Sequence, residues 1–183
     1  MIVAIQGQLG SFSEAAVRDA FGDAAQILSC ASFDDLFAAV ASGEAAFGAV
    51  PVRNTIIGPV ADNARRAHGA GFRVVCGVHH LVRQCLIARR GTTIESLRRV
   101  ASHPVALRQC SRFFASRPHL IAVPISDTAG GVRDLMLGHL DADAAIGSEE
   151  AARRYGAVVL ADRVEDNPQN FTEFLLITSS PWK

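Results

Sequence analysis

Five short polar motifs in the sequence could bind a small anion or move a proton. The first, residues 7–13, places Ser11 between an apolar run and a helical pattern. Backbone N–H groups at the start of a helix bind anions, although serines there also serve as helix caps. The spacing is not GxGxxG, and the lysine of a phosphate-binding loop is missing. This motif alone leaves an anion site and a structural turn equally open.

The second motif, residues 51–55, directly follows an apolar run. Ligands of open α/β sheets bind beyond the carboxyl ends of the strands, and Asn54 and Thr55 supply donors and acceptors there. Arg53 could pair with a carboxylate through two hydrogen bonds. A surface turn with a solvated arginine is the alternative, and loop composition favours it.

Two further motifs join a strand end to a helix start. In residues 102–110, His103 could act as an acid or base, but we favour a helix-capping role for it. Gln109, in the second turn of that helix, could face a ligand or solvent. After Asp127, the helix start at Thr128 and Ala129 could offer backbone N–H groups to an anion.

The fifth motif, residues 170–174, opens the last apolar run of the chain. It sets the hydroxyl of Thr172 beside the carboxylate of Glu173. In a strand, Thr172 and Phe174 share one face and Glu173 points to the other. An ordinary edge strand would show the same alternation.

Composition narrows the function classes. The chain has 183 residues, of which 49% are hydrophobic, with 18 basic and 18 acidic side chains. Such a chain is too apolar for disorder, and its zero net charge gives no general attraction to nucleic acid or anionic membranes. No apolar run is long enough to span a membrane, and the N-terminus lacks the basic segment of a signal peptide. We therefore expect a cytoplasmic protein that binds a small molecule.

No metal or cofactor site is expected from the sequence. The four cysteines, Cys30, Cys76, Cys85 and Cys110, form no CxxC pair and no zinc-ligand spacing. We expect reduced thiols packed in the interior. His79 and His80 are adjacent, so they point to opposite sides of a strand and make a poor metal site. No Ser-His-Asp triad can be assembled from the spacing.

Short apolar runs alternate with helical patterns, which indicates an α/β fold with largely parallel sheets. The expected strands are residues 2–5, 25–30, 47–50, 72–78, 81–88, 99–102, 120–123, 144–146, 158–160 and 172–178. The expected helices are residues 32–42, 59–68, 104–115 and 148–155, one capped by Ser11 or Ser13 that ends at about residue 21, and one capped near residues 126–128. Breaks near residues 78–81 and 162–171 suit chain crossings between two lobes, and a cleft between lobes suits a small ligand.

Six segments, in sequence order, each match a motif of one known enzyme family. Residues 7–14 resemble Gly-x-x-Gly-Ser-Phe-Ser-Glu, and residues 51–55 resemble Pro-Ile-Glu-Asn-Ser. Residues 78–81 are similar to a His-x-Leu strand, and residues 103–110 closely follow His-Pro-Gln-Ala-Leu-x-Gln-Cys. Residues 127–129 are similar to Ser/Asp-Thr-Ala, and residues 170–174 to an Asn-x-Thr-x-Phe ending. Together they resemble the catalytic domain of prephenate dehydratases, which form phenylpyruvate for phenylalanine biosynthesis.

The resemblance implies two α/β lobes like those of type II periplasmic binding proteins, with the site in the cleft. Lobe 1 would hold about residues 1–76 and 161–183, and lobe 2 about residues 77–160. It implies Thr172 as the general acid or proton relay at the leaving hydroxyl. It implies a substrate-binding set of Ser11, Arg53, Asn54, Thr55, Gln109, Thr128, Ala129, Glu173 and Phe174. It further implies a cytoplasmic homodimer with no cofactor and, on 183 residues, no C-terminal regulatory domain.

Two positions depart from the family pattern with opposite charge. The family's Thr-Arg-Phe reads Thr172-Glu173-Phe174 here, and the glutamate of Pro-Ile-Glu-Asn-Ser is Arg53. If these two side chains face each other, an ion pair is kept with its signs exchanged. Otherwise Glu173 points into solvent and Arg53 binds substrate by itself.

Three functions remain open at this point. Dehydration of prephenate to phenylpyruvate is the first. The altered Thr-Arg-Phe motif also suits a non-aromatising prephenate decarboxylase, which keeps the hydroxyl. The third is an inactive module that still binds a small anion.

Overall fold

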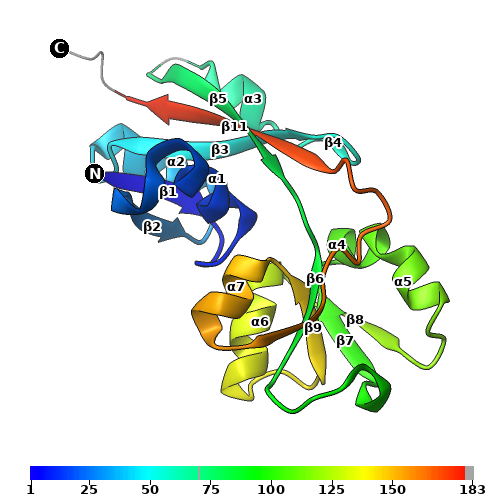
Figure 1. Cartoon of the computed structure of the whole chain (residues 1–183). Coiled ribbons are helices and arrows are strands. Elements are labelled where there is room, and N and C mark those ends of the chain that lie inside the picture. Colours follow the sequence, from blue (N-terminus) through cyan, green and yellow to red (C-terminus); the bar gives the residue numbers. More distant parts are fainter. Residues whose placement is uncertain (70, 180–183) are drawn as a thin grey trace. The chain divides into compact units, whose positions relative to one another are not determined.

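The computed structural model describes residues 1–69 and 71–179, and the chain divides into two compact units (Figure 1). Unit 1 contains Met1–Gly7, Phe12–Val82 and the chain from Gln169, and unit 2 contains Gln8–Ser11 and Arg83–Pro168. The chain passes between units after Val82 and after Pro168, later on both occasions than the expected 76–77 and 160–161. The reason is that the strand ending at Leu81 stays paired with the last strand of unit 1.

Unit 1 is built on a mixed six-stranded sheet. Its order is β2-β1-β3-β11-β5, and β4 pairs with β3. The strands are β1 (Ile2–Gln6), β2 (Gln26–Cys30), β3 (Phe47–Asn54), β4 (Gly58–Pro59), β5 (Arg73–Leu81) and β11 (Phe171–Thr178). Strand β1 is parallel to its neighbours, whereas β11 is antiparallel to both β3 and β5.

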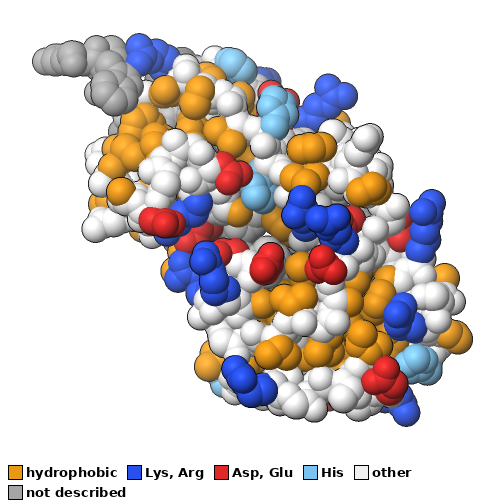
Figure 2. Space-filling view, in the orientation of Figure 1, with side chains coloured by type: hydrophobic (Ala, Val, Ile, Leu, Met, Phe, Trp, Pro, Cys, Tyr) orange, Lys and Arg blue, Asp and Glu red, His pale blue; other side chains and the backbone are white. Residues whose placement is uncertain are grey.

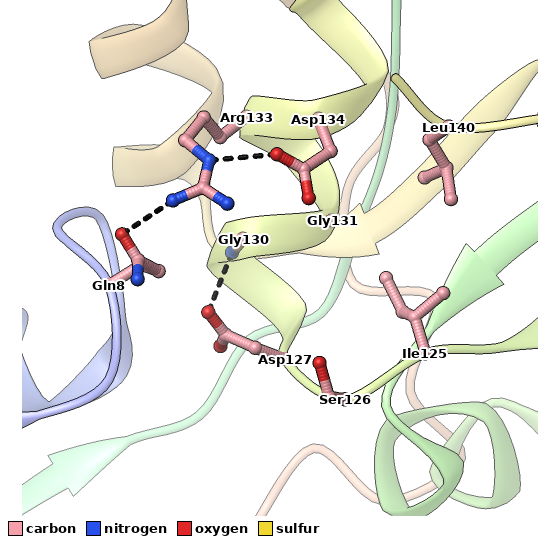
Figure 3. Close-up of a pocket in the computed structure, with 9 residues that line it drawn as sticks. All are labelled: Gln8, Ile125, Ser126, Asp127, Gly130, Gly131, Arg133, Asp134 and Leu140. Carbon is pink, nitrogen blue, oxygen red and sulfur yellow. Dashed lines mark hydrogen bonds and ion pairs between the residues drawn. The ribbon is translucent and has the colours of Figure 1, made fainter. Parts of the chain in front are cut away.

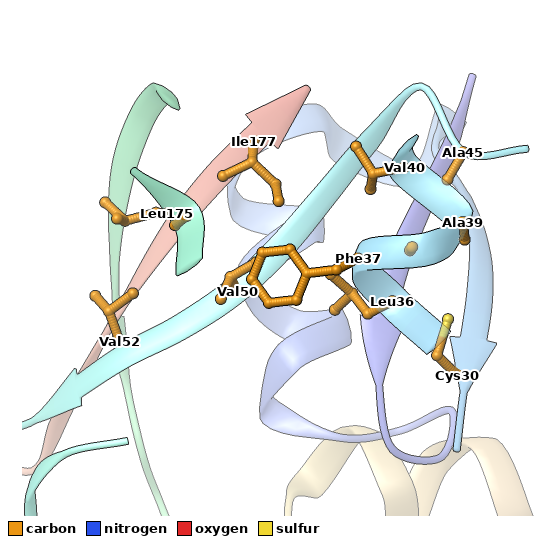
Figure 4. Close-up of a cluster of buried hydrophobic side chains, with 12 residues drawn as sticks. Cys30, Leu36, Phe37, Ala39, Val40, Ala45, Val50, Val52, Leu175 and Ile177 are labelled. Atoms are coloured by element: carbon orange, nitrogen blue, oxygen red, sulfur yellow. The ribbon is translucent and has the colours of Figure 1, made fainter. Parts of the chain in front are cut away.

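Helices α1 (Phe12–Phe21), α2 (Phe33–Ser42) and α3 (Asn63–Ala67) and the 3₁₀ turn η1 (Gly22–Ala24) complete unit 1. Ser32 and Asp35 close a capping box at the start of α2, and Gly43 ends it in the left-handed conformation. The apolar stripe of α2 then packs on one face of the sheet, in the core cluster of Figure 4.

Strand β11 alternates strictly between two cores. Leu175 and Ile177 belong to the α2 cluster, and Leu176 belongs to a second cluster with Val17 of α1. One face of β11 therefore packs toward α2 and the other toward α1. This alternation fixes which way the polar residues at the start of β11 point.

Unit 2 has a five-stranded sheet in the order β10-β6-β9-β7-β8. Strand β7 is parallel to β8 and β9, and β6 is antiparallel to β9 and β10. The strands are β6 (Cys85–Ala88), β7 (Arg99–Ser102), β8 (Ile121–Pro124), β9 (Ala144–Gly147) and β10 (Val158–Ala161). The helices are η2 (Ile94–Ser96), α4 (Pro104–Gln109), α5 (Ser111–Ala115), α6 (Thr128–Leu137) and α7 (Glu149–Tyr155).

The prediction of largely parallel sheets is wrong. It assumed that each helix connects two parallel neighbours, but β11 arrives from the end of the chain and inserts between β3 and β5. Two expected breaks are also absent. Strand β5 runs through His79 and His80 because both pair with β11, and β3 continues past Pro51 because the register shifts there.

Two predicted helices are shorter in the structure. The expected helix 59–68 is reduced to α3, since its first residues form β4 and a turn. The expected helix 104–115 divides into α4 and α5 at Cys110, whose backbone leaves the helical conformation.

All four cysteines are free thiols, but they are not all interior. Cys30, Cys85 and Cys110 are buried, whereas Cys76 on β5 is exposed, which corrects the expectation for that residue. Burial raises the pKa of Cys85 to about 11 and that of Cys110 to about 12. Both of these thiols are therefore protonated at neutral pH.

The surface and the helices agree with the composition. On the face shown in Figure 2, basic and acidic side chains are intermixed. In the described part of the chain, no helix has the length and apolarity needed to cross a bilayer. The same residues contain no group of three or more His, Cys, Asp or Glu side chains arranged to hold a metal ion.

Candidate functional site

The polar residues at the start of β11 form a row across three strands. Thr172 lies opposite Asn54 of β3 on one side and opposite His80 of β5 on the other. Side chains directly opposite each other in a sheet have Cβ atoms about 4.5–5.5 Å apart. Thr172 and Leu176 are an even number of residues apart, so their side chains point to the same face of β11. Leu176 packs in a cluster with Val17 of α1, and the row therefore lies on the α1 face of the sheet.

Asn54 is the centre of this row. Its side chain is buried, and its Nδ2 donates to Asn170 Oδ1 at 2.7 Å, to Thr172 Oγ1 at 2.9 Å and to the Phe171 carbonyl at 3.1 Å. Its Oδ1 accepts from the backbone N–H groups of Ile56 and Ile57 at 2.9 and 3.2 Å. The two backbone donors fix the orientation of the amide, so the N–H side must face Thr172.

The hydroxyl of Thr172 consequently accepts a hydrogen bond and keeps its own proton available. A threonine hydroxyl has one proton to donate besides its lone pairs. In the described part of the chain Asn54 is its only side-chain partner. Thr172 is 9% exposed, so a small ligand could reach the group while bulk water is largely excluded.

Thr55 and Asn170 fasten the ends of these strands together. Thr55 Oγ1 donates to the Gln169 carbonyl at 3.1 Å and accepts from the Phe171 N–H at 3.0 Å. The carbonyl of the fully buried Asn170 accepts from Val82 N–H at 2.7 Å. These bonds hold Thr172 from both sides and leave little freedom to its backbone.

His80 is the member of the row that the sequence did not single out. Its Nδ1 lies 2.7 Å from Asp19 Oδ2 of α1, and its ring centroid is 6.1 Å from that of Phe12. The alternation rule did place His79 and His80 on opposite faces, as found. It could not show which of them lies opposite Thr172, because the pairing of β5 with β11 joins distant parts of the chain.

The opposite face of β11 carries a second, charged row. Glu173 lies opposite Arg53 on β3 and opposite His79 on β5. Arg53 and His79 are exposed and Glu173 is half-buried. In the described part of the chain no ion pair joins Arg53 to Glu173. The exchanged ion pair is therefore not formed in this structure, although the register places the two residues opposite each other.

Phe174 is a core residue. It is only 2% exposed and lies opposite Val78 of β5. The family resemblance placed Phe174 in the substrate-binding set. The structure instead places the ring within the interior of unit 1, one step along the strand from Thr172.

In unit 2, Gln109 ends α4 in a polar junction. Its Oε1 accepts from Gln84 Nε2 at 3.4 Å, and its carbonyl accepts from Asp166 N–H at 2.6 Å. Gln84 is buried, and its Oε1 has no hydrogen-bond partner among the described residues. His103 caps α4, with Nδ1 accepting from Val105 N–H at 3.2 Å, which confirms the capping role.

Thr128 and Ala129 begin α6, where Thr128 is half-buried and Ala129 is buried. Asp127 caps this helix, and its Oδ2 accepts from Gly130 N–H at 2.8 Å. A cavity of about 310 Å³ adjoins this turn (Figure 3). Arg133 crosses it between Gln8 Oε1 and Asp134 Oδ1, each at 2.8 Å. Its charge is already paired, so the cavity is not a ready anion site.

Ser11 is buried and belongs to unit 2 with Gln8, Leu9 and Gly10. The loop is held by its neighbour Gly10, whose carbonyl accepts from Ser148 Oγ at 2.5 Å. Gly10 has φ of +86°, and a Cβ there would lie 2.8 Å from Ala151 Cα. The glycine of this motif therefore serves close packing on α7, which supports the structural-turn interpretation for that position.

Comparison with known proteins assigns this arrangement to a family. The sequence model of the family described as prephenate dehydratase matches residues 3–181. The chain belongs to the prephenate dehydratase family. It is 34% identical over 179 residues to arogenate dehydratase/prephenate dehydratase 2, chloroplastic, of Arabidopsis thaliana, covering 98% of this chain and 46% of that protein. It is 33% identical over 193 residues to prephenate dehydratase of Mycolicibacterium vanbaalenii, covering 96% and 61%.

Solved structures agree on the fold. Prephenate dehydratase of Arthrobacter aurescens in complex with L-Phe superposes with a TM-score of 0.91 at 28% identity, covering all of this chain and 61% of that one. A protein described as GqqA, a novel type of quorum quenching acylases, gives 0.89 at 30%, covering 100% and 66%. A nutrient binding protein of Burkholderia cenocepacia bound to methionine gives 0.51 at 12%, covering 98% and 84%. The last likeness concerns the fold alone and agrees with the expected periplasmic-binding-protein-like architecture.

The chain spans about half the length of the curated plant relatives it matches. Several of those relatives are named arogenate dehydratases. The family of this chain is thus established.

Proposed function

We propose that this chain catalyses the decarboxylating dehydration of prephenate to phenylpyruvate. The observation that carries the proposal is the hydroxyl of Thr172, which is oriented by Asn54 and retains a free proton. The reaction needs such a group, since the ring hydroxyl of prephenate is a poor leaving group until it receives a proton. Family membership supplies the reaction class.

The chemistry couples two bond cleavages. The ring carboxylate leaves as CO2, and the electron pair of its C–C bond moves through the cyclohexadiene ring to expel the 4-hydroxyl. The proton of Thr172 goes to the departing oxygen, which leaves as water, and the ring becomes aromatic. Asn54 stabilises the Thr172 oxygen during the transfer, because its N–H group donates to that atom throughout.

The roles of Asn54 and Thr55 differ from direct substrate binding. Every polar atom of the Asn54 side chain is already bonded within unit 1, and Thr55 both donates to and accepts from the start of β11. Both residues therefore act by holding Thr172. Ser11, Gln109, Thr128 and Ala129 belong to unit 2, and their part in substrate binding stays a prediction of the family resemblance.

The test is to incubate the protein with prephenate and, separately, with arogenate at neutral pH. Aromatic product and CO2 are measured together, with Thr172→Val as the matched control for spontaneous conversion. The proposal expects equimolar CO2 and phenylpyruvate from prephenate, and a higher kcat/KM for prephenate than for arogenate. A higher kcat/KM for arogenate would show that arogenate is the preferred substrate. The absence of product from both substrates would refute the proposal.

A non-aromatising decarboxylase is the second candidate, and the Thr172-Glu173-Phe174 sequence favours it. Placing an acid where the family has arginine could leave decarboxylation possible while expulsion of the hydroxyl is lost. Release of CO2 without an aromatic product in the same assay would decide for this candidate. Tight binding of prephenate without either product would instead indicate an inactive binding module.

A further inference from the structure

The proposed role of Thr172 leaves a proton unaccounted for. A threonine hydroxyl that gives up its proton becomes an alkoxide, a strong base, unless another group replaces the proton during the transfer. An ionisable side chain on the same face of the sheet is needed for this. In the described part of unit 1, the side chain that meets the requirement next to Thr172 is His80.

We propose that His80, held by Asp19, resupplies the proton that Thr172 delivers to the leaving hydroxyl. The inference rests on the proposed dehydratase activity and adds a positioning residue to it. His80 lies directly opposite Thr172 in the β5–β11 pairing, on the face that α1 covers. The imidazole is 16% exposed, so it is sheltered without being sealed from solvent.

Asp19 sets the state of the ring. Its Oδ2 lies 2.7 Å from His80 Nδ1, and an ionised carboxylate can only accept a hydrogen bond. Nδ1 therefore carries a proton, and Nε2 is the atom that gains and loses one. In the described part of the chain no group is bonded to Nε2, which leaves it available to Thr172 directly or through one water molecule.

The transfer balances without any further reactant. As the C–O bond of the substrate breaks, the Thr172 O–H proton moves to the departing oxygen to complete a water molecule. The Nε2–H proton of the imidazolium moves to Thr172 Oγ1, which restores the hydroxyl. Neutral imidazole is left, and bulk water reprotonates it before the next turnover.

Few other charges face His80. On α1, Glu14 and Arg18 pair with each other at 2.9 Å, and Asp19 is the charged group that contacts the ring. On β11 the neighbouring acid Glu173 points to the other face, as does His79 on β5 itself. Asp19 is therefore the charged side chain that holds the imidazole in place.

The test compares His80→Gln with His79→Gln, a matched change at the adjacent residue on the opposite face. We expect H80Q to lower kcat by about 10- to 100-fold, within the range of general acid catalysis, with KM changed by less than about threefold. Wild-type kcat should fall as pH rises through the range in which imidazole loses its charge, and this fall should be absent in H80Q. H79Q should match the wild type in all three respects.

Asp19→Asn is the second variant, because it leaves the ring in place and lies on a half-exposed helix position. It should lower kcat less than H80Q does, because a neutral amide oxygen holds the imidazole more weakly than a carboxylate. An H80Q enzyme with the wild-type kcat and pH profile overturns the inference, while the proposed function stands. If H80Q does not fold, a D19N enzyme with the wild-type kcat overturns it in the same way. A wild-type chain that turns over neither prephenate nor arogenate overturns both together.

Discussion

The two faces of β11 at its first residues differ in almost every physical respect. On the α1 face, Asn54, Thr172 and His80 are buried or sheltered, and Thr172 is joined to Asn54 by a short hydrogen bond. On the other face, Arg53, Glu173 and His79 are more exposed, and no ion pair joins Arg53 to Glu173 in the described part of the chain.

The difference explains where this chain can depart from its family. The residues that match the family motifs, Asn54 and Thr172, occupy the ordered face, where a change would leave buried polar atoms unpaired. The two exchanged charges lie on the other face, where Arg53 is exposed and Glu173 half-buried, so a charge of either sign costs less free energy there than in the interior. The comparison predicts that function depends on the first face and tolerates change on the second.

Thr172→Val should remove the proton-donating group from the ordered face without unfolding the protein. The change removes only the hydroxyl and keeps the β-branched shape that suits a strand. We expect turnover to fall by roughly 10²- to 10⁴-fold, measured as kcat at saturating substrate, with an unchanged far-UV circular dichroism spectrum. A variant that keeps more than about a tenth of the rate would show that Thr172 is not the proton donor.

Asn54→Leu should lower the stability of the fold through its effect on the same face. It removes five hydrogen bonds, among them those to Asn170 and Thr172 in the interior and those from the part-buried N–H groups of Ile56 and Ile57. We expect a loss of about 3 kcal/mol in the free energy of unfolding, which lowers Tm by roughly 6–12 °C. Arg53→Leu, one residue earlier and exposed, is the control and should shift Tm by less than about 2 °C. Similar losses in both variants would refute the distinction between the faces.

Asp166 offers a comparable test in unit 2, where one carboxylate accepts from Ser111 and Arg112 at the start of α5. Partial burial alone would raise its pKa, but these hydrogen bonds hold the pKa below its ordinary value. A lowered pKa contributes stability that is complete above about pH 4 and is lost as the pH falls through the folded-state pKa.

Asp166→Asn should therefore be less stable than the wild type by about 1 kcal/mol at neutral pH, the usual effect of weakening a helix cap. The deficit should shrink as the solution is acidified below about pH 4. Urea unfolding at several pH values measures it. A deficit that is constant with pH would mean that the charge of Asp166 is not what stabilises α5.

The smallest effect concerns the exposed face. A double-mutant cycle with Arg53→Ala and Glu173→Ala should give a coupling energy below about 0.5 kcal/mol, as for exposed charges that share no ion pair. Chemical unfolding of the four proteins supplies the measurement. A coupling energy well above 1 kcal/mol would show that Arg53 and Glu173 form the exchanged ion pair in solution.

Local signals in the sequence predicted local structure well. Ser32 and Gly43 delimit α2 as expected, His103 caps α4, and the alternation of Thr172 and Glu173 between faces follows from the two-residue period of a strand. Each of these depends on residues within a few positions of one another, so composition and spacing are sufficient to specify them.

Long-range pairing was not predictable in the same way. That β11 inserts between β3 and β5 depends on pairs of residues 90 to 129 positions apart in the sequence. The sequence near His79 and His80 suggested a break instead of a continuous strand. The hydrogen bonds that hold the Asn54 side chain were not predictable for the same reason. Its partners, Asn170 and Thr172, are adjacent to it only after the strands pair.

Adjacent residues on opposite faces of β11 give the most direct test of the account. The measurement is kcat/KM of Thr172→Val and of Glu173→Gln, on the substrate that the wild type converts faster. The account predicts a loss of at least about 100-fold at position 172 and a change within about threefold at position 173. Equal losses, or a larger loss at Glu173, would contradict it.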